Sequence, residues 1–168
     1  MKRFTCIGLI LLGIILLGQS SIYAEGVINV SRLKIGDGLD NYSFKTPSGD
    51  TIKSSEFSYP LLISVFTTWC KLCKKELKYL EVDYQSGKNE KNPISIVAIN
   101  AGERERSVRK YIKKRKLSLP VLIDSDLKFT KDLNIIGTPT VLLFNKEKTL
   151  IYQGNDLPKD WNELRYDS

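Results

Sequence analysis

Apolar residues occur along the chain as short continuous runs separated by longer amphipathic segments. The runs PLLISVFT (residues 60–67) and PISIVAIN (residues 93–100) have the length and composition of strands that are buried on both faces. Shorter segments with strand character are expected at 41–45, 51–53, 120–124, 140–144 and 150–152. A turn sequence, PSGD at 47–50, joins the first two of these into a hairpin. The pattern therefore predicts a sheet with a buried centre.

Helical spacing fills the segments between the buried runs. One face of a helix is predicted from the i, i+4, i+7 and i+11 spacing of its inward residues, Cys73, Leu77, Leu80 and Tyr84. Further helical segments are expected at 104–116, 126–133 and, as one or two short turns, 158–165. An N-terminal hairpin followed by the order β-α-β-α-β-α-β-β is typical of an α/β sandwich with a mixed sheet.

The first 24 residues differ from the rest of the 168-residue chain. Two basic residues precede an apolar run at 4–17, and a polar stretch then leads to Ile-Tyr-Ala at 22–24. This order is typical of a secretory signal peptide that is cleaved after Ala24. An uncleaved anchor, in which residues 4–17 tether the protein to a membrane, is the alternative, although the run is shorter than the roughly 20 residues that span a bilayer. Either way, we expect an exported protein of the cell envelope, in the periplasm or at the outer face of the cytoplasmic membrane.

Domain organisation and charge follow from this division. We expect a polar lead-in at 25–35 and one domain at 36–168, acting as a monomer. Without residues 1–24 the chain holds 24 basic and 19 acidic residues, a net charge of +5. Much of this charge lies in RERSVRKYIKKRK (104–116), which is typical of a solvated helix face; docking to an acidic protein or an anionic membrane is the alternative. No nucleic-acid motif accompanies the charge, so nucleic acid is not an expected partner.

Two cysteines stand two residues apart in TTWCKLCKKE (67–76), directly after a buried strand. A zinc site would lack ligands, because the chain has no His and its third cysteine, Cys6, lies in the N-terminal segment. A purely structural disulfide would close too small a loop to remove much chain entropy. Neither a metal nor another cofactor is therefore expected, and thiol–disulfide redox chemistry is the favoured interpretation.

The position of the pair divides the work between its two thiols. Cys70 is expected at the N-terminus of a helix that begins near Lys71, where unpaired backbone N–H groups and the helix dipole favour a thiolate. Cys73 would face inward one turn later and could attack a mixed disulfide formed at Cys70. The prediction is an exposed nucleophile, Cys70, and a buried resolving thiol, Cys73.

Two further features belong to this chemistry. Glu76 falls on the inward face of the same helix, where desolvation would raise its pKa and suit it to exchange protons with the Cys73 sulfur. A solvated Glu on a lysine-rich turn is the alternative. The sequence GTPT at 137–140 precedes a strand, and a cis peptide bond between Thr138 and Pro139 would leave backbone groups beside the cysteines free to bind an extended substrate.

The combination of WCKLC and GTPT resembles the thioredoxin superfamily over residues 35–152. The details are most similar to its exported TlpA/ResA-like branch of thiol–disulfide oxidoreductases, with an N-terminal hairpin and a strand–helix insertion matched by 121–133. The resemblance implies a central mixed β-sheet flanked by helices, and it assigns the functional residues. The redox-active disulfide is Cys70–Cys73, the cis-proline is Pro139, the functional carboxylate is Glu76, and substrate-binding residues are Trp69, Lys71, Leu72 and Thr138.

The sequence departs from the family pattern at two places. Lys71 and Leu72 stand between the cysteines instead of Gly-Pro, and Ser64 occupies the strand position of the buried Asp of thioredoxin. Family members often act as reductants, for example on apocytochrome c before haem attachment. We therefore expect a reductase of disulfides in exported proteins, supplied by a membrane electron donor.

Three other functions stay open on the sequence. An oxidase or isomerase could use the same scaffold. A peroxidase is suggested by the spacing of Thr67 and Cys70, which matches peroxiredoxins, although the proline expected upstream is absent. Outside enzymology, the basic helix could make this a docking protein with an incidental disulfide.

Overall fold

The computed structural model describes residues 30–87 and 94–161. The predicted signal segment or anchor, residues 25–29 of the lead-in and the end of the turn at 158–165 lie outside these residues. None of the helices within the two described ranges is long and apolar enough to cross a membrane.

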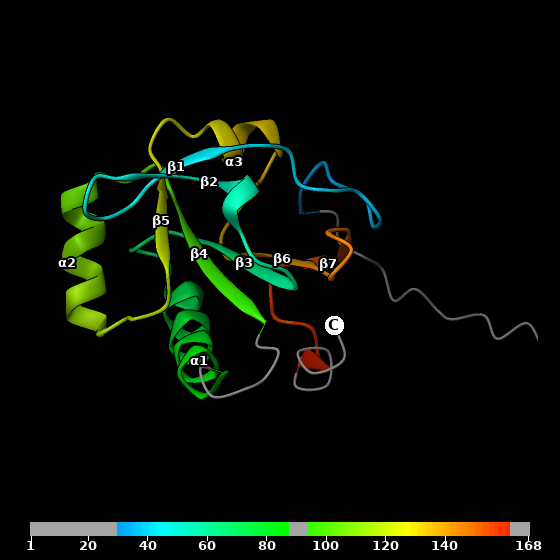
Figure 1. The fold of residues 1–168 in the computed structure, drawn as a ribbon. Coiled ribbons are helices and arrows are strands. Elements are labelled where there is room, and N and C mark those ends of the chain that lie inside the picture. Colours follow the sequence, from blue (N-terminus) through cyan, green and yellow to red (C-terminus); the bar gives the residue numbers. More distant parts are fainter. Residues whose placement is uncertain (1–29, 88–93, 162–168) are drawn as a thin grey trace, which may run out of the picture.

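A single seven-stranded sheet forms the centre of the molecule, with the strand order β2-β1-β5-β4-β3-β6-β7 (Figure 1). Strands β3, β4 and β5 are parallel to one another, and all other neighbours are antiparallel. The strands are β1 (Ser43–Lys45), β2 (Thr51–Lys53), β3 (Leu61–Phe66), β4 (Ser95–Ala101), β5 (Val121–Asp124), β6 (Thr140–Phe144) and β7 (Leu150–Gly154). The mixed sheet with a buried centre is confirmed.

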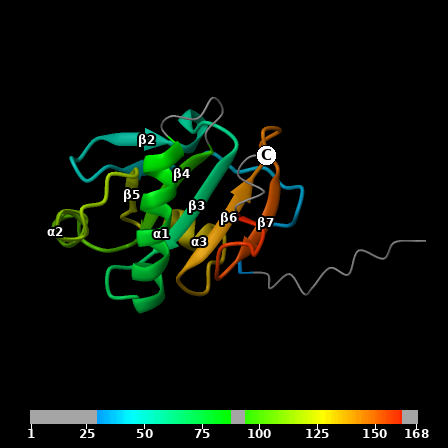
Figure 2. The same ribbon diagram turned by 90° about the horizontal axis from the view of Figure 1, so that it is seen from below.

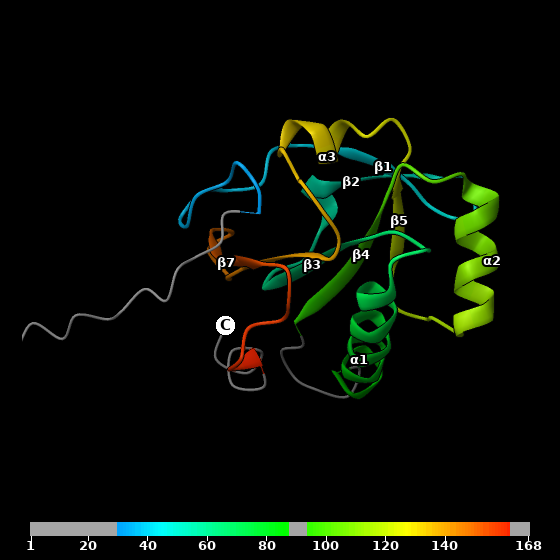
Figure 3. The ribbon, with the colours of Figure 1, turned by 180° about the vertical axis from the view of Figure 1, so that it is seen from behind.

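Helices cover the two faces of the sheet. They are a 3-10 turn η1 (Ser54–Glu56) and the α-helices α1 (Lys71–Gly87), α2 (Glu105–Arg115) and α3 (Lys128–Asp132). Figure 3 shows α3 and α1 on opposite sides of the sheet, and Figure 2 shows α1 lying across β3 and β4. Because β3 alternates its side chains between two cores, Leu62 and Phe66 pack with α1 and α2, whereas Ile63 and Val65 pack with α3.

The element order agrees with the sequence pattern, and the differences lie at element ends. The first strand begins at Ser43 instead of 41, and the segment 126–133 is helical only over α3. Tyr84 is half-buried, whereas the other three residues of the predicted α1 face are fully buried. Element ends depend on the loops that follow them, which explains why periodicity places them less well than element centres.

The parallel pairing of β3 and β4 positions the cysteine-containing loop. Phe66, the last residue of β3, lies opposite Asn100 near the end of β4. The segments that follow the two strands therefore leave the sheet side by side, at the carboxyl edge where open α/β sheets place their binding sites. One of these segments is 67–70, which leads directly into α1.

Candidate active site

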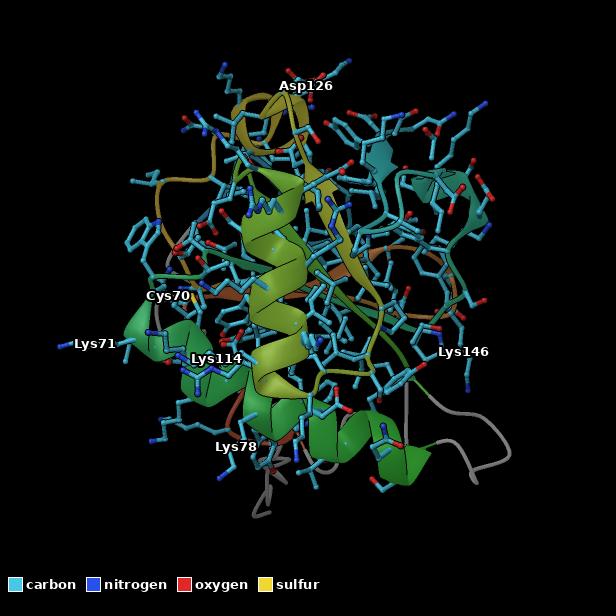
Figure 4. The ribbon with its side chains drawn as sticks, turned by 90° about the vertical axis from the view of Figure 1, so that its left-hand side faces the viewer. Cys70, Lys71, Lys78, Lys114, Asp126 and Lys146 are labelled. Carbon is cyan, nitrogen blue, oxygen red and sulfur yellow. A yellow bond between two sulfur atoms is a disulfide. The ribbon has the colours of Figure 1, made fainter. Side chains whose placement is uncertain are left out.

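Cys70 and Cys73 are joined by a disulfide at the start of α1, with their Cα atoms 5.3 Å apart. Cys70 directly precedes the helix, and Figure 4 shows it at the end of α1 beside Lys71. Cys73 has no exposed surface and Cys70 keeps 7% of its own. The expected order of exposure is thus found, but Cys70 is far less open than predicted, because the loop at 137–139 packs over it.

The backbone at the start of α1 faces the Cys70 sulfur. The N–H of Cys73 donates a hydrogen bond to Cys70 Sγ at 3.1 Å, and the N–H of Lys74 donates to the Cys70 carbonyl at 3.3 Å. The sulfur therefore occupies the place of a helix-capping acceptor, which accepts from the third helical residue. A thiolate at Cys70 would be stabilised by this N–H group and by the positive end of the helix dipole.

The Thr138–Pro139 peptide bond is cis, as predicted. The carbonyl oxygen of Thr138 lies 3.5 Å from Cys70 Sγ, a contact that a reduced thiol could convert into an S–H···O hydrogen bond. The hydroxyl of Thr138 lies 3.3 Å from that of Thr67, and Asn155 donates to the Pro139 carbonyl at 2.9 Å. These contacts bring the segments before β6 and after β7 to the disulfide.

Glu76 lies on the inward side of α1, three residues after Cys73, and is half-buried. Its Oε1 accepts a hydrogen bond from Ser64 Oγ of β3 at 2.6 Å. Burial raises the pKa of Glu76 to about 7, opposed by the Ser64 hydrogen bond and reinforced by the negative charge of Asp156. The predicted inward position is confirmed, and burial acts on the pKa of Glu76 in the predicted direction. The exchange of protons with the Cys73 sulfur stays a prediction.

A cleft of about 570 Å³ opens beside the disulfide, between α1 and the segment at 156–161. Leu72, Glu76 and Pro139 line the end of the cleft that belongs to the cysteine site, and Leu157 and Trp161 line the other wall. A half-buried carboxyl and the cis-proline therefore face the same apolar space. Such a space suits the side chains of a bound polypeptide.

Large apolar side chains near the disulfide are exposed to solvent. Trp69 is 72% exposed, Leu72 65% and Ile136 82%. They come from the segment before α1, from the turn between the cysteines, and from the segment before Pro139. A group of exposed apolar residues on separate segments is typical of a surface that contacts another protein.

A second carboxylate, Glu103, holds the segment that leads to the cysteines. Its Oε2 accepts from the Thr68 N–H at 2.6 Å and from Asn100 Nδ2 at 2.7 Å, and its Oε1 accepts from the Thr68 hydroxyl at 2.7 Å. Asn100 Oδ1 in turn accepts from the N–H of Glu103 at 3.1 Å. We refer to Glu103, Asn100 and Thr68 as the loop clamp. It fixes the residue two positions before Cys70.

The loop clamp was missed by the sequence reasoning. The only sequence signal for it is a buried polar residue, Asn100, at the end of an otherwise apolar run, because buried amides need partners. The acceptor for the Asn100 amide is Glu103, in the segment after β4. This segment lies beside residues 67–70 only in the folded sheet.

Residues 35–153 match the AhpC/TSA family. The chain belongs to the AhpC/TSA family. The matched range contains both cysteines, Glu76, the loop clamp and Pro139, so the whole site lies within the shared domain. The resemblance to thioredoxin-like proteins stated from WCKLC and GTPT is thereby confirmed.

Known relatives of this AhpC/TSA family member share its domain. Thiol-disulfide oxidoreductase ResA of Bacillus subtilis is 27% identical over 151 residues, which are 89% of this chain and 83% of the relative. The crystal structure of StoA from Bacillus subtilis has a TM-score of 0.61 at 24% identity, covering 76% of this chain and 95% of StoA. A thiol:disulfide interchange protein from Bacteroides sp. has a TM-score of 0.67 at 21% identity, covering 80% of this chain and 90% of its own.

These relatives and the Cys70–Cys73 disulfide identify the AhpC/TSA member as a thiol–disulfide oxidoreductase. The thioredoxin-like fold is confirmed by the solved structures. Of the predicted site residues, Cys70, Cys73, Glu76, Thr138 and Pro139 come together around the disulfide. Trp69 and Leu72 lie at its rim as exposed side chains, and Lys71 is exposed at the first position of α1.

Replacing Glu103 with Gln is expected to loosen the loop clamp. A glutamine offers one acceptor oxygen where the carboxylate offers two, and its NH₂ group would face the donors of Thr68 or Asn100. The loss of charge-assisted, partly buried hydrogen bonds should lower the free energy of unfolding by about 1–3 kcal/mol. Denaturant unfolding of the oxidised protein measures this change.

Glu105→Gln is the matched control for the loop clamp. The substitution removes the same charge two residues away from Glu103. The Glu105 side chain forms only an exposed ion pair with Arg109 on the surface of α2. Such a pair contributes about 0.5 kcal/mol or less. Equal effects of the two substitutions would show that the clamp adds nothing beyond surface charge.

Proposed function

We propose that this oxidoreductase is an exported reductase that uses Cys70 as nucleophile on disulfides of other exported proteins. The half-buried Glu76, with its pKa near 7 and its place on the inward face of α1, is the observation that carries the proposal. The N-terminal segment at 1–24 supports export, and the exposed apolar rim at Trp69 and Leu72 supports a protein substrate.

The exchange proceeds in two steps that conserve electrons. The Cys70 thiolate attacks one sulfur of the substrate disulfide, a mixed disulfide forms, and the other substrate sulfur leaves as a thiolate. The Cys73 thiol then passes its proton to the Glu76 carboxylate and attacks the Cys70 sulfur. The second substrate thiolate leaves, so the substrate gains two electrons and the protein ends as the Cys70–Cys73 disulfide.

The same carboxylate favours the reducing direction. Above pH 7 Glu76 is negative, and a negative group near Cys73 raises the cost of a thiolate there. This effect on Cys73 makes the pair a stronger reductant and opposes the stabilisation of the Cys70 thiolate by the helix, because a stabilised reduced form is the mark of strong oxidants. Reduction of the disulfide after each cycle requires a dithiol donor, for which a membrane protein is the proposed source.

The geometry disfavours two of the three alternatives. The hydroxyl of Thr67, which a peroxidase would use for peroxide, lies 3.3 Å from the Thr138 hydroxyl. An oxidase or isomerase would share the site and differ in potential. A docking protein would have no use for the raised pKa of Glu76.

The reduction potential of the purified protein tests the direction of transfer. Equilibration against glutathione or dithiothreitol buffers is expected to give a value near that of thioredoxin, roughly −270 mV. A value of roughly −120 to −180 mV would instead identify an oxidant or isomerase. Rapid peroxide consumption with a sulfenic acid at Cys70 would replace the proposal with a peroxidase.

Export, oligomeric state and client are tested separately. Cell fractionation with an N-terminal sequence of the mature protein distinguishes cleavage after Ala24 from a tether through residues 4–17. Light scattering tests the expected monomer. Among exported clients we propose apocytochrome c, and loss of covalently bound haem in a strain lacking the protein would support it.

A further inference from the structure

A groove of about 390 Å³ lies between α1 and α2, and it borders the cis-proline cleft at Lys78 and Val82 of α1. Its basic lining residues are Lys74 and Lys78 of α1, Lys114 and Arg115 of α2, and Lys116 directly after α2. We call this the basic groove. Figure 4 shows Lys78 of α1 and Lys114 of α2 on the face of the molecule that also presents Cys70 and Lys71.

Neighbouring carboxylates offset only one of the five positive charges of the basic groove. Glu81 is the one acidic residue among those that line it. Its carboxylate is occupied by the Ser118 N–H at 2.8 Å, the Ser118 hydroxyl at 2.5 Å and the Leu119 N–H at 3.0 Å. Within the part of the chain that the structure describes, the ion pairs lie elsewhere and include none of the five basic residues.

The end of α2 explains only two of these five basic residues. The last turn of α2 holds Lys114 and Arg115, where positive side chains interact favourably with the helix dipole, and Arg115 also lies 5.7 Å from the centre of the Tyr111 ring. Lys74 is in the opposite situation, because it lies near the N-terminal, positive end of α1. Together with Lys78, it adds positive charge opposite the already basic end of α2, which like-charge repulsion disfavours.

We propose that the basic groove binds an acidic segment of the protein whose disulfide is exchanged at Cys70; this inference rests on the proposed function. Apolar residues lie between the charged ones, including Leu77 and Val82. A hollow with an apolar floor and a cationic rim fits the aliphatic and carboxylate parts of Asp and Glu side chains. Lys74 lies one helical turn from Cys70, so a segment held there is held beside the reacting disulfide.

A membrane surface fits the groove less well. Anionic head groups are attracted to a flat or convex cationic face, whereas these residues surround a hollow between two helices. A chain segment can enter that hollow, and its approach would be steered by the same charges. The two partners are separated by the experiment below.

The test uses two synthetic peptides that each contain one intramolecular disulfide. They are identical except that a stretch of four Glu in one is replaced by four Gln in the other. Second-order rates of exchange with the reduced protein are measured at low and high salt. We expect the Glu peptide to react roughly tenfold faster at low salt, because charge steering raises association rates by about 10–10³. The advantage should shrink at high salt, where exposed charges are screened.

The ratio of the two rates is then compared between variants. Lys114→Gln combined with Lys116→Gln is expected to remove most of the advantage of the Glu peptide. Lys131→Gln combined with Lys146→Gln makes the same change of charge outside the groove and is expected to keep it; Figure 4 shows Lys146 well away from Lys114. Equal losses in the two variants would show that net charge, not the groove, governs the preference, and would overturn the inference.

Binding is measured separately with cysteine-free versions of the peptides by fluorescence anisotropy. Exchange with neither peptide would contradict the proposed function, and the binding measurement would then test the groove by itself. Tighter binding of the Glu peptide that depends on Lys114 and Lys116 would support the groove as a site for acidic segments. Equal binding of the two peptides would overturn that inference. Equal exchange rates for the two peptides also overturn it. Sedimentation with phosphatidylglycerol vesicles that depends on the same lysines, together with equal peptide binding, would assign the groove to a membrane.

Discussion

Replacing Cys73 with Ser is expected to trap substrates on Cys70 as stable mixed disulfides. The first step needs only the Cys70 thiolate, whereas the second needs the Cys73 sulfur, which is fully buried against Cys70. Turnover of a disulfide substrate should therefore fall to the background rate while the covalent adduct accumulates. Non-reducing gel electrophoresis and mass spectrometry measure the adduct.

Cys70→Ser is the matched control for the trap. It also removes one sulfur and the disulfide, but it leaves the buried Cys73, which has no exposed surface from which to attack a substrate. We expect background turnover and no adduct. Adducts of similar yield in both variants would contradict the division of labour between the two thiols.

Replacing Glu76 with Gln is expected to slow exchange at neutral pH by roughly 10²-fold or more, the usual contribution of a positioned proton-transfer group. The wild-type rate should change with an inflection near pH 7, where Glu76 titrates. The variant keeps the size and the acceptor oxygen of the side chain but cannot titrate, so this inflection should be absent. A pH–rate profile of the resolving step, followed after rapid mixing, measures both effects.

Ser64→Ala changes the pKa of Glu76 while the Glu76 side chain stays in place. The Ser64 hydroxyl donates to Glu76 Oε1 and lowers its pKa. Without this hydrogen bond the carboxylate is less stabilised, and the inflection should move to higher pH while exchange continues. If the inflection stays near pH 7 in both Glu76→Gln and Ser64→Ala, the titrating group is not Glu76.

The same substitution of Glu76 should alter stability in a pH-dependent way. The folded protein keeps the Glu76 proton up to about pH 7, whereas the unfolded chain loses it near 4.5. The folded state therefore binds more protons between these values, and this group lowers the free energy of unfolding as the pH rises from about 4.5 to about 7. Above pH 7 the penalty is constant, on the order of 3 kcal/mol.

Glu76→Gln should accordingly stabilise the oxidised protein at pH 8 and change it little at pH 4. Denaturant unfolding at the two pH values measures the difference. A variant that is more stable and less active would show that the buried carboxyl is kept for its chemistry. Equal stability of variant and wild type at pH 8 would show that the carboxylate is effectively solvated.

Some of the site was accessible from residues adjacent in the chain. The Cys70–Cys73 pair, its place at the start of a helix and the cis bond before Pro139 all depend on local geometry, so WCKLC and GTPT predicted them. Glu76 was placed inward by its spacing from Cys73 and Leu80 alone. The prediction that Cys70 is exposed was wrong, because the segment that covers this residue lies 68 residues further along the chain.

The sequence by itself determined which segments form strands and helices, which face of α1 is buried, and which two cysteines form the disulfide, because each of these follows from apolar spacing or from a motif of a few residues. Only the tertiary structure decided the strand order, the Ser64 partner of Glu76, the loop clamp and the basic groove. The clamp joins Thr68 to Glu103 across 35 positions. The groove joins α1 and α2, which precede and follow β4 in the chain. Such contacts are set by the parallel pairing of β3 with β4 and by the packing of α1 and α2 on one face, and neither leaves a periodic trace in the chain.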